Sequence, residues 1–378
     1  MKIYLNENVW DAALKRFRWL FDEFENIIVN VSGGKDSTVC LNLALMVAEE
    51  KGRLPLKVSF IDQEAEWQTV IDHMRLIMAD PRVEPHWLQV PIRIFNATST
   101  IEPWLNCWEP GKEWIRDKEP ISIKENVFGT DRFAEMFGAQ CKHLFGDSPA
   151  CMIGGVRAEE SPARLNGLTA YETYKGETWG RVENKKRGQY VMYPIYDWSY
   201  TDVWKAIHDN HWLYCPIYDY MYQYGYPVAS MRVSNVHHET AVMHLKYLQE
   251  IEGATWNKIV ARISGLNSVA HLQADFMAPK VLPPMFSDWF DYRDHLLKYM
   301  VTDDDIRGKL RRQFASADAR YSPEIHGALV KVEIACVLLG DYHGTKLSTF
   351  AASHGKFSKN NGIRNRGLLP PRRQEAQA

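Results

Sequence analysis

The sequence predicts an α/β fold, with a doubly wound and mostly parallel sheet followed by a lobe of helices. In the first half of the chain, short apolar runs rich in β-branched residues alternate with longer stretches of helical spacing. This alternation is the pattern of a parallel sheet with crossover helices. A turn with two adjacent glycines separates the first of these runs from the helical stretch after it, and from about residue 230 to residue 339 the pattern turns helical.

Each element follows from its own pattern. Strands are expected at 27–31, 56–61, 86–92, 150–154 and 189–193, and helices at 8–25, 36–50, 65–79, 240–251, 255–263, 289–300, 302–314 and 323–339. Prolines at positions 85 and 91 bound the third strand. Ser199 followed by Asp202 predicts a capping box at the start of one further helix.

The chain is expected to have three parts. An α/β domain covers 1–229, with an irregular insertion at about 95–148, and a helical lobe covers 230–345. The last part, 346–378, is expected to be a mobile tail, since residues 346–373 contain seven Lys or Arg and no Asp or Glu. A solvated tail is one interpretation. Contact with nucleic acid through this basic tail is the other.

Composition excludes several classes of protein. The 378 residues carry 45 Lys or Arg against 47 Asp or Glu, a formal charge of −2, so nucleic-acid binding would need a local basic patch. No apolar run approaches the roughly 20 residues of a membrane helix, and the N-terminus lacks the apolar core of a secretion signal. The six cysteines form no C-x-x-C pair, which argues against a disulfide scaffold, a zinc site or an iron–sulfur cluster. We therefore expect a cytoplasmic protein without membrane contact.

The sharpest motif lies between the first strand and the helix at 36–50. It consists of Ser32, Gly33, Gly34, Lys35, Asp36 and Ser37. Two glycines let the backbone turn tightly beside an anion, which the amides at the helix N-terminus then face. Lys35 adds a positive charge, and the spacing differs from that of the Walker loop. We interpret the motif as a phosphate-binding loop of another kind; a plain glycine turn into a helix is the alternative.

A second motif follows the strand at 150–154. Gly155 opens a turn, and Arg157 and Arg164, with Ser161 between them, can converge on an anion. Guanidinium forks suit the oxygens of phosphate or sulfate. The alternative is a surface network in which the adjacent glutamates neutralise both arginines.

These motifs resemble those of a known family. The first matches the S-G-G-x-D-S loop of the PP-loop ATP pyrophosphatases. Residues 152–164 resemble the G-x-R-x-x-E-S-x-x-R segment of phosphoadenylyl-sulfate (PAPS) reductases, residues 193–204 resemble a further segment of that family, and residues 215–219 are similar to its N-P-L-Y-D segment. Together the matches cover about residues 25–225. Weaker matches, at residues 231–233 and beyond, resemble the phage and prophage subgroup of IbrA-type co-activators.

The resemblance implies an adenine nucleotide alpha hydrolase-like fold with ATP or PAPS as its ligand. The first activity it implies is cleavage of ATP between the α and β phosphates, to AMP and pyrophosphate, which activates a substrate. Lys35, Asp36, Arg157 and Arg164 would carry this chemistry. One alternative is a sulfonucleotide reductase acting on PAPS in sulfur metabolism. Another is a non-catalytic, nucleotide-sensing transcriptional co-activator of phage or prophage genes, acting with a ParB-like protein partner.

The cysteines depart from the pattern of a reductase. PAPS reductases carry a nucleophilic cysteine in an E-C-G-I-H segment, whereas Cys336 stands in an apolar helical stretch. A reactive thiolate needs an accessible, electropositive site. Cys141 and Cys151 are the other candidates for redox chemistry.

The second strand ends in a run of carboxylates where the reductases have a different sequence. Asp36, together with Asp62 or Glu64, is expected to hold Mg²⁺ against the nucleotide phosphates, because magnesium prefers few carboxylates and phosphate oxygens. The alternative is an acidic start of a helix, which suits the helix dipole.

Overall fold

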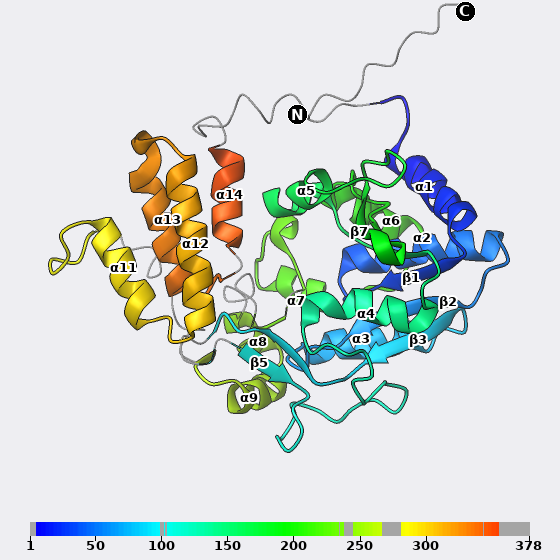
Figure 1. Cartoon of the computed structure of the whole chain (residues 1–378). Helices are drawn as coiled ribbons and strands as arrows, with labels where there is room; N and C mark the ends of the chain where they lie inside the picture. The colour runs from blue at the N-terminus through cyan, green and yellow to red at the C-terminus, as the bar shows by residue number, and fades with distance from the viewer. Residues whose placement is uncertain are drawn as a thin grey trace, which may run out of the picture. The chain divides into compact units, whose positions relative to one another are not determined.

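The computed structural model describes residues 5–98, 102, 104–233, 235–237, 245–266, 281–342 and 344–354. The strands are β1 Asn26–Asn30, β2 Leu56–Ile61, β3 Val83–Leu88, β4 Ile92–Phe95, β5 Trp104–Cys107, β6 Ala150–Gly154, β7 Gly180–Asn184 and β8 Gln189–Met192. The α-helices are α1 Val9–Glu23, α2 Lys35–Glu50, α3 Gln68–Met78, α4 Phe133–Phe145, α5 Pro162–Thr169, α6 Tyr200–Asp209, α7 Ile217–Gln223, α8 Leu245–Ile251, α9 Gly253–Arg262, α11 Trp289–Tyr299, α12 Asp304–Arg320, α13 His326–Leu338 and α14 Thr345–Ser353 (Figure 1).

The larger of two compact units, Met1–Asn96 with Trp104–His271, is built on a six-stranded sheet. The strand order is β3-β2-β1-β6-β8-β7, in which only β7 is antiparallel to its neighbour. From β1 the chain runs outward to β2 and β3, and then returns to β6 on the other side of β1. The strand order therefore reverses between β1 and β6, which is where open α/β sheets bind ligands. The predicted fold class is confirmed.

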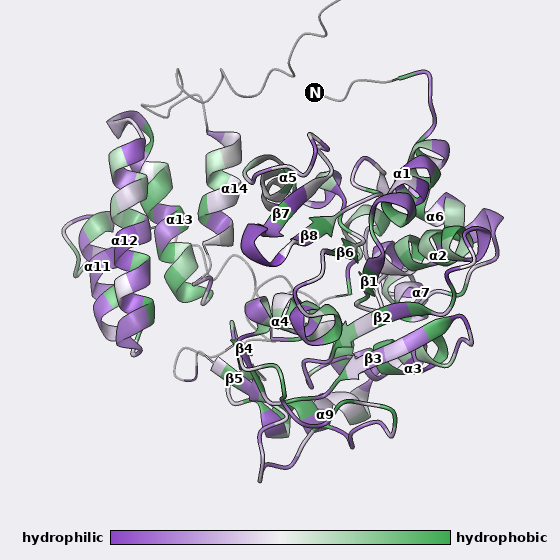
Figure 2. Cartoon of the chain, turned by 45° about the vertical axis from the view of Figure 1, so that its right-hand side comes forward, coloured by the Kyte–Doolittle hydropathy of each residue, from purple (hydrophilic) through white to green (hydrophobic). Residues whose placement is uncertain are grey.

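Alternate residues of β1 face two different layers of helices. Ile27 and Val29 belong to the main core together with residues of α1, α2 and α6, whereas Ile28 packs with Cys141 of α4 and with Met152 of β6. Since both faces of the sheet are covered, its central strands are apolar on both sides. Figure 2 shows hydrophobic residues gathered in β6 and α2.

The structure differs from the prediction around the third strand. β3 begins at Val83 and so contains Pro85 within it. It is an edge strand that pairs with β2, and a proline is tolerated there because one side of the strand needs no N–H donor. The stretch 95–148, expected to be irregular, contains β5 and α4. β7 was missed because its residues, GRVEN, are largely polar.

The smaller unit, Ala97–Pro103 with Leu272–Ala378, contains α11 to α14. α13 packs against α11, α12 and α14, and the core includes Tyr321, Leu329 and Phe350. α14 covers residues with which the basic tail was expected to begin, and the rest of that tail lies outside the described residues. None of the described helices is both long enough and apolar enough to cross a membrane.

Candidate functional site

The predicted phosphate loop turns directly from β1 into α2. Gly33 has a φ of 71°, and a Cβ at this position would stand 2.7 Å from Cγ1 of Val70 on α3, so glycine alone fits. The hydroxyl of Ser37 donates to the carbonyl oxygen of Gly34 at 2.9 Å and accepts the N–H of Ser32 at 3.2 Å. The loop is therefore held in a tight turn by its own residues.

Backbone amides at the start of α2 are left without acceptors among the described residues. They belong to Gly33, Gly34, Asp36 and Ser37. All four residues are buried, and buried amides are normally paired. At a helix N-terminus, the missing acceptor is readily supplied by an anion.

An ion-pair network joins this loop to the segment that follows β6. Nζ of Lys35 donates to Oδ2 of Asp36 at 2.9 Å, and Nε of Arg157 donates to Oδ1 of the same carboxylate. All three side chains are buried. A Cβ on Gly155 would lie 2.6 Å from the carbonyl oxygen of Asp36, so the turn after β6 is pressed against the start of α2. The two loops flanking the strand-order reversal thus meet, with two cations around one anion.

The rest of the second motif is arranged differently. Oγ of Ser161 accepts the N–H of Arg164 at 3.2 Å at the start of α5. The side chain of Arg164 is 56% exposed, and its Nε lies 3.7 Å from a carboxylate oxygen of Glu160. Within the described chain, Arg164 is therefore not part of the network of Arg157, and it has the acidic neighbour that the alternative interpretation expected.

Asp62 is completely buried and already has its donors. Its Oδ2 accepts from Nε1 of Trp87 at 3.0 Å and from Nε2 of Gln89 at 2.9 Å. Its Oδ1 accepts the N–H of Glu64 at 2.9 Å and a guanidinium N–H of Arg116. This carboxylate therefore stabilises the turn after β2.

Glu64 is also fully buried and is bound by Nε of Arg262 at 2.8 Å and by the N–H of Trp108 at 2.6 Å. Both oxygens of Asp36 are held by cations as well. Every oxygen of these three carboxylates already accepts at least one hydrogen bond, and the described residues contain no cluster of three or more metal-ligating side chains. Magnesium binding at these carboxylates stays a prediction. Burial, and the nearby charge of Asp62, raise the pKa of Glu66 to about 8.

Two residues to which the sequence assigned no role complete the surroundings of Lys35. The hydroxyl of Tyr218 on α7 accepts the N–H of Lys35 at 2.9 Å, and its ring centroid lies 5.3 Å from Nζ. Nζ also donates to the carbonyl oxygen of Met231 at 3.1 Å. Tyr218 stands in the segment 215–219, so resemblance to a family segment was a usable signal. Met231 makes its contact through a backbone carbonyl oxygen, so the type of its side chain could not indicate it.

All six cysteines are buried and unpaired. Burial raises the pKa of each thiol, that of Cys141 to about 11 and that of Cys215 to about 12. Cys141 and Cys151 belong to different core clusters. None of the thiols has the accessible, electropositive surroundings that a nucleophilic thiolate needs.

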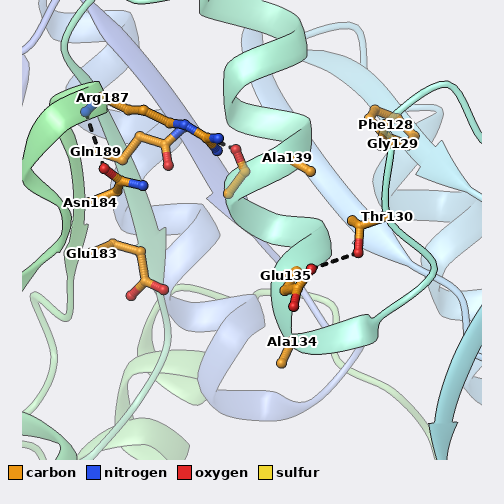
Figure 3. A pocket seen from close by; sticks show the side chains of 11 residues that line it. Phe128, Gly129, Thr130, Ala134, Glu135, Ala139, Glu183, Asn184, Arg187 and Gln189 are labelled. Carbon is orange, nitrogen blue, oxygen red and sulfur yellow. Dashed lines mark hydrogen bonds between the residues drawn. The ribbon is translucent and has the colours of Figure 1, made fainter.

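A pocket of about 360 Å³ lies elsewhere in the larger unit (Figure 3). Its lining includes Glu135, Arg187 and Gln189, and none of the predicted site residues. Gln189 pairs with Ala150, and both residues begin their strands. The pocket therefore lies toward the amino ends of the strands, whereas the phosphate loop follows a carboxyl end.

The strand-order reversal and the loop at its carboxyl end define a nucleotide-binding α/β protein, and comparison with known sequences gives the family. Residues 26–225, more than half of the chain, match the model of the phosphoadenosine phosphosulfate reductase domain. The chain therefore belongs to the PAPS reductase family and has its PP-loop nucleotide-binding domain.

One relative extends the similarity beyond this domain. Over 327 residues the chain is 30% identical to the uncharacterized protein YbdN of Escherichia coli K12. The aligned region covers 82% of this chain and 80% of YbdN. Solved structures resemble it more distantly. A PAPS reductase from Candida auris in a phosphate complex covers 63% of this chain and 99% of its own, at 16% identity and a TM-score of 0.32. The match to an FMN adenylyltransferase from Candida glabrata, in complex with FMN and an ATP analogue, covers 62% of this chain and 66% of the adenylyltransferase chain, at 13% identity and a TM-score of 0.37.

Proposed function

We propose that this protein binds ATP at the loop after β1 and cleaves it between the α and β phosphates, passing AMP to a substrate. The observation that carries the proposal is the set of amides at the start of α2 that belong to buried residues and have no acceptor in the described part of the chain, beside two buried cations at the strand-order reversal. Such a site is complementary to a polyphosphate. Membership of the PAPS reductase family makes an adenine nucleotide the expected ligand.

The residues of the loop have separate roles in this proposal. A nucleophile of the substrate forms a bond to the α-phosphorus, and the bond from that phosphorus to the bridging oxygen breaks. The electron pair leaves with pyrophosphate. The loop amides, Lys35 and Arg157 stabilise that departing charge, and Asp36 positions both cations. Most of the rate enhancement would come from positioning and electrostatics.

The same site supports a sulfonucleotide reductase less well. Reduction of PAPS by a protein thiol needs an accessible thiolate, and every cysteine here is buried with a raised pKa. PAPS still matches the site as a ligand, because the oxygens of its phosphate and sulfate groups accept hydrogen bonds from amides and guanidinium groups as the phosphate oxygens of ATP do.

Binding of ATP tests the first half of the proposal. Lys35→Ala should weaken ATP binding by about 10- to 100-fold, because a charged hydrogen bond is worth roughly 1.5–3 kcal/mol. Lys51→Ala is the matched control, since Lys51 follows the opposite end of α2 and pairs with exposed Asp22. Calorimetric titration of both variants gives the comparison. An unchanged ATP affinity in Lys35→Ala would remove the loop from nucleotide binding.

Product analysis tests the second half. With ATP labelled at the α phosphate, the expected products are labelled AMP, free or attached to a substrate, and pyrophosphate. Formation of ADP would contradict cleavage at the α–β bond. Sulfite released from PAPS in the presence of thioredoxin would identify a reductase instead, and tight nucleotide binding without any turnover would favour the co-activator.

A further inference from the structure

A short segment lies over the carboxyl ends of three strands. This cover segment consists of residues 231–233 and 235–237, within the larger unit. The carbonyl oxygen of Met231 accepts from Lys35, a guanidinium N–H of Arg232 donates to the carbonyl oxygen of Glu160, and the N–H of Val236 donates to the carbonyl oxygen of Ala65 at 3.4 Å. The cover segment thus joins the loops that follow β1, β6 and β2.

Arg232 is the cation that this segment adds to the site. Its guanidinium group donates to a neutral carbonyl oxygen, and among the described residues it forms no ion pair. The other cations of this edge are each beside a carboxylate: Lys35 and Arg157 share Asp36, and Arg164 lies beside Glu160. A half-buried guanidinium group with free donors and no neutralising carboxylate is suited to an anion.

The positive charge at the phosphate loop is smaller than the negative charge of the proposed ligand. Lys35, Asp36 and Arg157 together carry one net positive charge, whereas ATP or PAPS carries several negative ones. Arg232 follows directly after Met231, whose carbonyl oxygen lies 3.1 Å from Nζ of Lys35. The backbone before Arg232 therefore lies beside Lys35, and its guanidinium group lies against the segment after β6, which also carries Arg157.

We propose that Arg232 binds an anionic group of the nucleotide beyond its α-phosphate, and so selects nucleotides that carry such a group. The inference rests on the proposed function, because it places a ligand at the loop. The group is chemically a phosphate or a sulfate: a β or γ phosphate of ATP, or the sulfate or 3′-phosphate of PAPS. Arg232 contacts it with the fork that its bond to Glu160 leaves free.

Binding constants for ATP, PAPS and AMP, measured by calorimetry on the full chain, test this role. Arg232→Ala should weaken the binding of ATP, of PAPS or of both by about 10- to 100-fold, as expected for loss of one charged contact. The binding of AMP should weaken by no more than about threefold. Arg232→Lys keeps the charge but loses the guanidinium fork, so its binding constants should lie between those of the wild type and of Arg232→Ala. Arg18→Ala is the matched control, since Arg18 pairs with Glu50 at the far end of α2 and should leave all three constants unchanged.

The outcomes separate the possible explanations. If Arg232→Ala loses affinity for ATP alone, Arg232 contacts the polyphosphate. If it loses affinity for PAPS alone, Arg232 contacts the sulfate or the 3′-phosphate. Equal losses for all three ligands would mean that Arg232 only supports the fold, and would overturn the inference. Unchanged ATP and PAPS constants, in a chain whose binding still requires Lys35, would overturn it while the proposed function stands. If the wild-type chain binds neither nucleotide, both fail.

Discussion

Gly155 shows how closely single residues determine the geometry of the site. Besides its approach to Asp36, a Cβ at this position would lie 2.7 Å from Cα of Ser37, and both contacts are to backbone atoms that cannot swing aside. Any side chain here must push the turn after β6 away from the start of α2. The network between Asp36 and Arg157 depends on that contact.

We therefore predict that Gly155→Ala weakens ATP binding by at least about tenfold and lowers the free energy of unfolding by about 1–3 kcal/mol, the usual cost of overpacking. Gly327→Ala is the control, because a Cβ on this glycine of α13 meets nothing within 4 Å. Chemical denaturation and calorimetric titration give the two quantities. Wild-type ATP affinity in Gly155→Ala would show that the two loops need not touch for binding.

The residues that the sequence identified and those it missed differ in kind. The motif at 32–37 and Arg157 could be proposed because their types and spacing suit an anion, and the structure brings Lys35, Asp36 and Arg157 together. Asp62 and Glu64 have suitable types, but the structure uses both as buried acceptors for indole, amide and guanidinium groups. Their partners, such as Arg262, come from distant parts of the chain that no local pattern connects to them. Arg232, whose role in ligand binding is our proposal, lies in a segment that the sequence singled out only through a weak family resemblance.

Elements were predictable where one local pattern determines them. The strands at 56–61 and 150–154 have the predicted bounds, and the capping box of Ser199 and Asp202 is confirmed at the start of α6. β3 was misplaced because its status as an edge strand, which tolerates Pro85, is a property of the whole sheet. Pairing partners far apart in the chain are fixed by tertiary structure, which local periodicity does not encode.

A buried histidine links two helices of the site. Nε2 of His73 on α3 lies 3.2 Å from Oγ1 of Thr38 on α2, three residues after Lys35. Burial lowers the pKa of His73 to about 4. Protonation therefore favours the unfolded chain, in which the pKa is near 6.5. The stability contributed by the neutral imidazole is complete above pH 6.5 and is lost as the pH falls through about 4.

We predict that His73→Gln, which keeps a polar partner for Thr38 and does not titrate, reduces the loss of stability between pH 6.5 and pH 4. From the size of the pKa shift, the difference between variant and wild type over this interval is roughly 3 kcal/mol at most. Urea unfolding at a series of pH values measures it. Parallel pH profiles for the two proteins would show that His73 is not protonated on unfolding.

At the scale of the whole molecule, the chain consists of two compact units with separate cores. The phosphate loop, Arg157 and the cover segment all belong to the larger unit, so a nucleotide bound there would stabilise that unit. The net charge of −2 leaves nucleic-acid binding dependent on local basic residues. Most of the predicted basic tail lies outside the described residues, and its contact with nucleic acid stays a prediction.

The two cores predict two unfolding transitions in a calorimetric scan. ATP at 100 times its dissociation constant should stabilise the larger unit by about 2.7 kcal/mol, raising the midpoint of one transition and leaving the other unchanged. Leu329→Ala, which truncates a fully buried side chain of α13, should lower the midpoint of the other transition alone. The free energy of unfolding of the smaller unit should fall by about 2–5 kcal/mol. If ATP and Leu329→Ala instead shift one common transition, the two units unfold together, and nucleotide binding stabilises the smaller unit as well.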